Sequence, residues 1–113
     1  MSEHSITRAL DLALDYESVA PDQVVDGSPR TGLWEAESGG LGVWEMTPGA
    51  MRDVEVDEFF VVVSGEATLE RQVEGVSETS ELRPGMVCRL FEGEETVWRV
   101  RSALRKVYWI PGS

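Results

Sequence analysis

Turn signals that contain glycine divide this chain into short segments at nearly regular intervals. They fall, mostly about ten residues apart, at Asp26-Gly27, Gly39-Gly40, Pro48-Gly49, Ser64-Gly65, Glu74-Gly75, Pro84-Gly85 and Glu92-Gly93. The segments between them are rich in Val, Trp, Phe, Thr and Leu, residue types that favour strands. Short strands at regular spacing are typical of an all-β sandwich or barrel and not of alternating strands and helices.

We expect eight strands, each bounded by these turn signals. Their expected ranges are Thr31–Ala36, Leu41–Met46, Asp57–Val63, Glu66–Val73, Val76–Leu82, Met86–Phe91, Glu95–Arg101 and Arg105–Ile110. Residues two apart in a strand share a face, so Ala67 and Leu69 are expected on one face, as are Thr96, Trp98 and Val100.

Length and charge limit the classes of protein to consider. The chain has 113 residues, which suits one domain, and 42% of them are hydrophobic, enough for a core. The formal net charge of −11 repels phosphate backbones and anionic lipids, so we expect no nucleic-acid and no membrane partner. No signal peptide or membrane span is visible, and Cys88 is the only cysteine, so a cytoplasmic location is the simplest interpretation.

We expect an N-terminal arm over residues 1–23 and a single barrel domain over residues 24–113. The arm is ambiguous, because Leu10, Leu12 and Leu14 alternate as in a strand while residues 5–14 are also compatible with a short helix. Pro21 ends either element.

Two segments match the paired motifs of the cupin superfamily. The first is a Glu followed after six residues by a Gly, here Glu58 and Gly65. The second opens with Pro84-Gly85, runs through a strand and turns at Gly93. The chain therefore resembles a cupin over roughly residues 24–110, which implies an all-β double-stranded β-helix, or jelly-roll, barrel.

A narrower likeness is to the small cupins grouped with the cupin domain of (S)-ureidoglycine aminohydrolase. It rests on residues 26–32 (DGSPRTG), 42–49 (GVWEMTPG), 57–59 (DEF), Trp98 and 105–108 (RKVY).

The histidines of a metal-binding cupin are missing. Such cupins supply two His shortly before the motif Glu and another three residues past the second turn Gly. Here residues 51–57 contain no His, the latter position is Thr96, and the only histidine of the chain is His4. Transition metals need three or four converging donors, and Glu58 alone remains. We expect no metal and no other cofactor.

Three further acids precede Glu58 and are possible oxygen donors for Mg²⁺ or Mn²⁺. Asp53 and Glu55 could join Glu58, but Asp57 is its direct neighbour in an extended segment and should point the other way. An oxygen-only metal site is therefore disfavoured.

Glu58 is the main candidate for a catalytic or ligand-binding residue, because its motif position implies that it points into the barrel. Without a metal, its carboxylate must bind a ligand or water, hold its own proton, or pair with Arg52, Arg89 or Arg105. We favour the ligand over the structural ion pair, and so expect Glu58→Gln to cost little stability.

Further side chains are expected to line a ligand pocket around Glu58. They are Phe60, Trp98, Thr96, Trp44 and Met51. Core packing is the alternative role for the tryptophans. Cys88 is expected to be buried and inert, because no His-paired nucleophile can form near it. No Ser-His, Cys-His or Lys constellation stands out in the sequence.

Three functions fit these observations. The first, which we favour, is a metal-free cupin that binds a small organic molecule in the barrel mouth near Glu58. The second is an enzyme related to the ureidoglycine aminohydrolase-type cupins that acts on a small polar substrate, although metal-assisted chemistry would lack its ion. The third is a non-catalytic oligomeric module, structural or regulatory, with a filled barrel.

A homodimer is expected as well. The run Phe59–Val63 is apolar on both faces, and the C-terminal run Tyr108–Ile110 is apolar as well; Trp34 and Trp109 are candidates for the interface. This is more apolar surface than one small barrel easily covers, and the resemblance implies pairing through outer strands.

Overall fold

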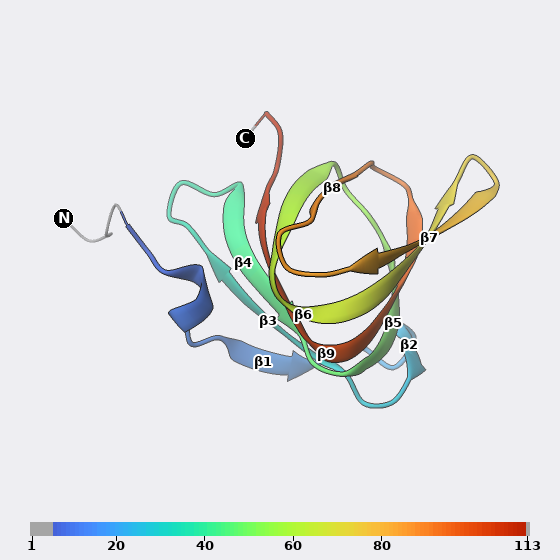
Figure 1. The fold of residues 1–113 in the computed structure, drawn as a ribbon, viewed down its shortest axis with the longest axis horizontal. Coiled ribbons are helices and arrows are strands. Elements are labelled where there is room, and N and C mark those ends of the chain that lie inside the picture. The colour runs from blue at the N-terminus through green and yellow to red at the C-terminus, as the bar shows by residue number, and fades with distance from the viewer. Residues whose placement is uncertain (1–5, 113) are drawn as a thin grey trace.

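The computed structural model describes residues 6–112. They form one 3-10 turn and nine strands, shown in Figure 1: η1 (Ala9–Asp11), β1 (Asp15–Ser18), β2 (Val24–Asp26), β3 (Arg30–Glu35), β4 (Leu41–Met46), β5 (Gly49–Val54), β6 (Glu58–Val73), β7 (Val76–Leu82), β8 (Val87–Leu90) and β9 (Glu95–Trp109). None of the helical structure in this part of the chain is long and apolar enough to cross a membrane.

The strands form a single antiparallel sheet that curls into a jelly-roll barrel, which confirms the expected all-β cupin fold (Figure 1). One path through it runs β1-β3-β4-β9-β5-β2, and β6 adds β7, β8 and β9 as neighbours. The longest strands, β6 with 16 residues and β9 with 15, pair with each other along most of their length. On its other edge β9 pairs first with β5 and then with β4, so it joins the parts of the barrel.

Expected and observed strands agree closely in several places. Leu41–Met46 and Val76–Leu82 have the expected bounds. Four of the expected strands have the wrong bounds. The two expected between residues 57 and 73 are one continuous strand, β6, and the two expected between residues 95 and 110 are also one strand, β9. The Ser64-Gly65 signal is a bulge and not a turn: Gly65 has φ +93°, and the register against β9 shifts between Val62 and Ala67. An added Cβ at Gly65 would lie 2.0 Å from the carbonyl oxygen of Ala103, so only glycine fits.

The N-terminal segment takes part in the sheet. β1 pairs with β3, and only the three-residue η1 represents the helix considered for residues 5–14. The Arg105 guanidinium binds this segment, donating hydrogen bonds to the carbonyls of Ala9 and Leu12 at 2.8 and 2.9 Å. These carbonyls are thus satisfied outside a regular helix.

The predicted alternation of faces is confirmed. Ala67, Leu69, Trp98 and Val100 are buried, and Thr96 lies on the same side. Together with Phe60, Val62, Met46, Met51, Leu82, Leu90, Leu104 and Tyr108 they form most of the hydrophobic core. Each large apolar side chain buried there contributes roughly 1.5–3 kcal/mol.

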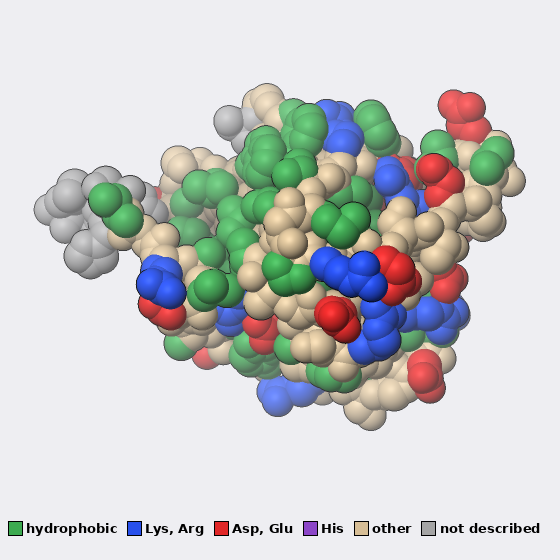
Figure 2. Space-filling view, in the orientation of Figure 1, with side chains coloured by type: hydrophobic (Ala, Val, Ile, Leu, Met, Phe, Trp, Pro, Cys, Tyr) green, Lys and Arg blue, Asp and Glu red, His purple; other side chains and the backbone are tan. Residues whose placement is uncertain are grey.

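The opposite face of the sheet is also apolar where β4, β9 and the start of β6 lie side by side. Leu41, Trp109 and Phe59 form one cross-strand row, and Val43, Val107 and Val61 the next. We call these six residues the outer apolar patch. Trp109 stacks on Phe59, yet 38% of Trp109 and 43% of Leu41 remain exposed. Figure 2 shows hydrophobic side chains gathered over this part of the sheet.

Candidate functional site: a buried lysine–glutamate pair beside a cavity

Glu58 and Lys106 meet inside the barrel. Glu58 begins β6 and shares its inward face with Phe60 and Val62, whereas Lys106 lies on β9 directly opposite Val62. The Lys106 ammonium donates a hydrogen bond to Oε2 of Glu58, with 2.7 Å between Nζ and the oxygen. Both side chains are almost fully buried, at 6% and 11% exposure.

Three aromatic rings surround the ammonium. Nζ of Lys106 lies 4.7, 4.5 and 4.6 Å from the ring centres of Trp44, Phe60 and Trp98, respectively. A cation over the face of an aromatic ring is attracted by its quadrupole, most strongly where water is excluded. The aromatic cage and Glu58 together stabilise a positive charge in a place that otherwise disfavours one.

The alternative in which an arginine pairs with Glu58 is wrong for Arg89 and Arg105, because Glu58 pairs with Lys106 instead. Arg89 pairs with Asp57 at 3.3 Å, and Arg105 pairs with Glu45 at 2.7 Å. The reason is that successive side chains of a strand point to opposite faces. Arg105 and Lys106 are neighbours on β9, so only Lys106 shares the inward face with Glu58.

A cavity of about 270 Å³ opens beside the pair. It is lined by Glu35, Trp44, Asp53, Glu55, Val56, Glu58, Trp98, Lys106, Tyr108 and Ile110. Three of the expected site residues, Glu58, Trp44 and Trp98, thus reach the same cavity. Phe60 packs against the Trp98 ring and Met51 belongs to the hydrophobic core, and neither of the two lines the cavity.

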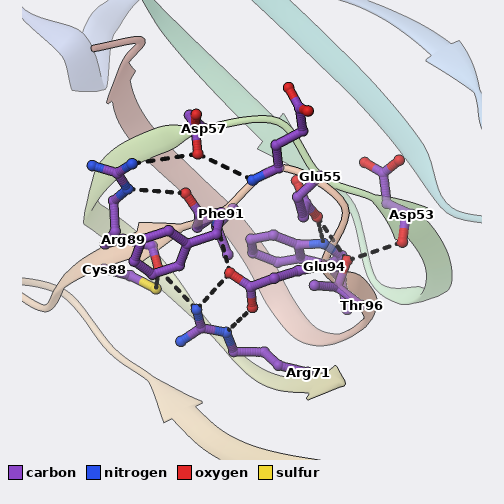
Figure 3. Close-up of polar contacts among 12 residues, drawn as sticks. Asp53, Glu55, Asp57, Arg71, Cys88, Arg89, Phe91, Glu94 and Thr96 are labelled. Atoms are coloured by element: carbon purple, nitrogen blue, oxygen red, sulfur yellow. Dashed lines mark hydrogen bonds and ion pairs between the residues drawn. The ribbon is translucent and has the colours of Figure 1, made fainter. Parts of the chain in front are cut away.

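Glu55 is a second buried acid of the cavity. Its Oε2 accepts hydrogen bonds from the Thr96 hydroxyl at 2.6 Å and from the Trp98 indole N–H at 3.1 Å (Figure 3). Loss of solvent raises the pKa of Glu55 above its ordinary value, and the negative charge of Asp53 adds to the rise. Thr96 therefore donates a hydrogen bond to a cavity residue, Glu55, but does not line the cavity itself.

The acidic side chains do not fit a cupin metal site. Glu58 is bonded to an ammonium, and Asp57 points away from it toward Arg89, as the sequence predicted (Figure 3). Within residues 6–112 no three His, Cys, Asp or Glu side chains are grouped so that they could hold a metal ion. His4 lies outside the described residues.

Sequence reasoning missed Lys106, although a signal was present. The chain contains nine arginines and one lysine, and that lysine lies within the 105–108 motif already singled out. Cys88 is half-buried, and desolvation raises the pKa of its thiol, which favours the unreactive protonated form.

A larger hollow of about 620 Å³ lies between β5, the β6–β7 hairpin and the start of β9. Its lining is mainly exposed polar side chains, and Thr96 is the one fully buried contributor among them. Among the described residues no aromatic side chain lines this hollow, so it is a weaker candidate than the cavity at Lys106.

Solved structures of similar fold come from several bacteria. A DUF861-family protein of unknown function from Pseudomonas syringae pv. tomato is 21% identical, covering 89% of this chain and 45% of that one, with TM-score 0.68. A putative ethanolamine utilization protein Q from Salmonella typhimurium is 17% identical, covering 86% and 95%, with TM-score 0.56. The Clostridium difficile EutQ protein is also 17% identical, covering 85% and 78%, with TM-score 0.55.

A search of the curated proteins gave no match. The family model of the EutQ-like cupin domain, in contrast, matches residues 33–108, which run from within β3 to one residue before the end of β9 and include both motifs. This chain belongs to the EutQ-like cupin family.

Proposed function

We propose that this cupin binds a small organic molecule in the cavity beside Lys106 and Glu58, without a metal ion. The observation that carries the proposal is a buried ion pair on the wall of a cavity in the barrel, where aromatic and polar side chains converge. Small-molecule sites are typically concave, largely apolar and supplied with a few well-placed polar groups.

The chemistry of the lining supports this assignment. Trp44 and Trp98 offer flat apolar faces, while Glu55, Glu58 and Lys106 offer hydrogen-bond acceptors and a donor. A barrel kept only as a structural module would gain stability from apolar residues at the positions of a buried ion pair. The pair is therefore better explained by binding. The narrower likeness to the ureidoglycine aminohydrolase cupins rests on sequence motifs and remains a prediction.

Ligand screening with a blocked-cavity variant tests the proposal. Val56 lines the cavity and is 55% exposed, so Val56→Trp should fill the opening without touching the ion pair. Val87→Trp, at a position 66% exposed and away from the cavity, is the matched control. We expect some amides, sugars or carboxylic acids to raise the melting temperature of the wild type and Val87→Trp, but not of Val56→Trp. Equal responses in all three proteins, or none in any, would count against a ligand in this cavity.

A further inference from the structure

Lys106 is the single lysine of a chain that uses arginine at its nine other basic positions. It is also the one basic side chain on the wall of the 270 Å³ cavity. Arginine keeps its proton under all ordinary conditions, whereas a lysine can lose it and become a nucleophile. A purely structural partner for Glu58 needs only the charge, so the use of lysine at this one buried position points to the chemistry of an amine.

We propose that Lys106 is a carbonyl-reactive amine, which forms an imine with a small aldehyde or ketone bound in the cavity. This inference rests on the proposed function, because the carbonyl compound would be the ligand of the same cavity.

The contacts of Lys106 supply the proton acceptor that the first step needs. Glu58 takes a proton from Nζ along the existing 2.7 Å hydrogen bond, leaving a neutral amine. The amine lone pair attacks the carbonyl carbon, a C–N bond forms, and a proton moves from nitrogen to the former carbonyl oxygen. The product of this step is a carbinolamine.

The second step expels water, and it needs an acid. Glu55 lines the same cavity, and its burial favours the protonated carboxyl group. It donates a proton to the hydroxyl as the C–O bond breaks and the nitrogen lone pair forms the C=N bond. Glu58 then loses its proton to solvent and Glu55 regains one. Overall a protonated amine and a carbonyl compound give a protonated imine and water, and no oxidant or reductant is consumed.

The aromatic cage stabilises the positive charge of the protonated imine as well as that of the free Lys106 ammonium. A protonated imine keeps the positive charge on the same nitrogen, so the rings of Trp44, Phe60 and Trp98 and the carboxylate of Glu58 continue to stabilise it. Exclusion of water by the surrounding barrel also slows hydrolysis of an imine.

Reductive trapping tests the proposal on the intact protein. Benzaldehyde and propionaldehyde are added separately with sodium cyanoborohydride near pH 7, and peptide mapping by mass spectrometry locates the alkyl group. The only other primary amine is that of the N-terminus, whose ordinary pKa near 8 is lower than that of a free lysine, so it reacts readily near pH 7. The N-terminal amine is therefore a stringent internal reference for the rate of labelling at Lys106. We expect Lys106 to be labelled faster, on the order of tenfold, because the cavity positions the aldehyde.

Variants show whether the residues act as assigned. Lys106→Arg keeps the charge and should leave only N-terminal labelling, while Glu58→Gln and Glu55→Gln should slow labelling at Lys106 and not at the N-terminus. Labelling of Lys106 that is no faster than at the N-terminus, or that is unchanged by both glutamine variants, overturns the proposal.

Benzyl alcohol, which has no carbonyl group, separates this inference from the proposed function. Competition by benzyl alcohol against benzaldehyde labelling supports both. If benzyl alcohol or benzaldehyde changes the tryptophan fluorescence, to which Trp44 and Trp98 of the cavity contribute, but Lys106 is not labelled, ligand binding stands and the imine is wrong. If neither compound binds, Lys106 is not labelled and the ligand screen is negative, both proposals fail.

Discussion

The ammonium of Lys106 lies 2.7 Å from the carboxylate of Glu58; both side chains are buried, and three aromatic rings surround the ammonium. The charge that a metal ion supplies to this Glu in metal-binding cupins is here supplied by a side chain of the chain itself. Each charge is tolerated in the barrel only because the other is present.

Glu58→Gln should therefore destabilise the protein, on the order of 3 kcal/mol, because it leaves a buried ammonium without its counter-charge. This differs from the expectation drawn from sequence, which lacked a buried partner for Glu58. Removing both charges in Glu58→Gln/Lys106→Met should cost less than Glu58→Gln alone. Urea unfolding of the wild type, Glu58→Gln, Lys106→Met and the double variant at pH 7 measures this, and additive losses would show that the two residues are not coupled.

Glu55→Gln should stabilise the fold at pH 7. Desolvation raises the pKa of Glu55 in the folded state, so above the ordinary value of about 4.3 the unfolded state loses this proton more readily than the folded state, and stability falls as the pH rises. The penalty disappears as the pH falls below the ordinary value of about 4.3, since the acid is then protonated in both states. The gain from Glu55→Gln, measured by thermal unfolding, should shrink between pH 7 and pH 4. A gain independent of pH would contradict this origin.

The ion pair between Arg71 and Glu94 should produce the opposite dependence on pH. Both guanidinium contacts are 2.8 Å, and the Phe91 N–H also donates to Glu94 (Figure 3). Desolvation raises the pKa of Glu94, but these hydrogen bonds and the charge of Arg71 outweigh it, so the net shift is downward. Its contribution to stability is thus present above about pH 4.3 and lost as the pH falls through the lower folded value.

Glu94→Gln should accordingly cost on the order of 3 kcal/mol at pH 7 and progressively less in acid. Glu92→Gln, an exposed neighbour in the same turn, serves as the control and should stay within about 0.5 kcal/mol of the wild type. Acid unfolding curves that are the same for all three proteins would show that this pair does not contribute.

A homodimer remains our expectation, and the outer apolar patch is the surface we expect it to use. Trp109→Ser removes the largest exposed side chain of the patch, whereas Val76→Ser removes an apolar side chain 62% exposed on the β6–β7 hairpin. Light scattering at micromolar concentration should show dissociation only for Trp109→Ser. A wild-type mass of 12.5 kDa would show that the chain is a monomer.

The purified protein should contain no stoichiometric transition metal. Residues 6–112 offer no suitable donor group, and Glu58 is already bonded to Lys106. Elemental analysis after purification without chelators provides the measurement. About one Fe, Mn, Ni or Zn per chain would mean that the ligands are other than the motif residues.

Motif spacing and alternation were sufficient to predict the barrel and the inward position of Glu58. They could not predict its partner, because Lys106 lies 48 positions away and comes close only through the pairing of β6 with β9. Nor could they distinguish a turn from a bulge at Gly65, since both need the same positive φ. The sheet register that resolves these questions is a property of the whole barrel.

The strand β5 shows a further limit. Gly49–Val54 contains Arg52 and Asp53, and its apolar residues do not alternate, so no strand was expected there. It forms because β9 and β2 flank it on both edges and satisfy its backbone hydrogen bonds.

The position of β9 in the chain also matters while the protein is being made. Three of the earlier strands, β4, β5 and β6, have this final strand as a hydrogen-bonding neighbour. A nascent chain that has not yet extended past Glu95 therefore exposes unpaired edges and the apolar faces of β4 and β6. Folding must wait for the last part of the domain to leave the ribosome, and chains released too early are the ones most prone to aggregate.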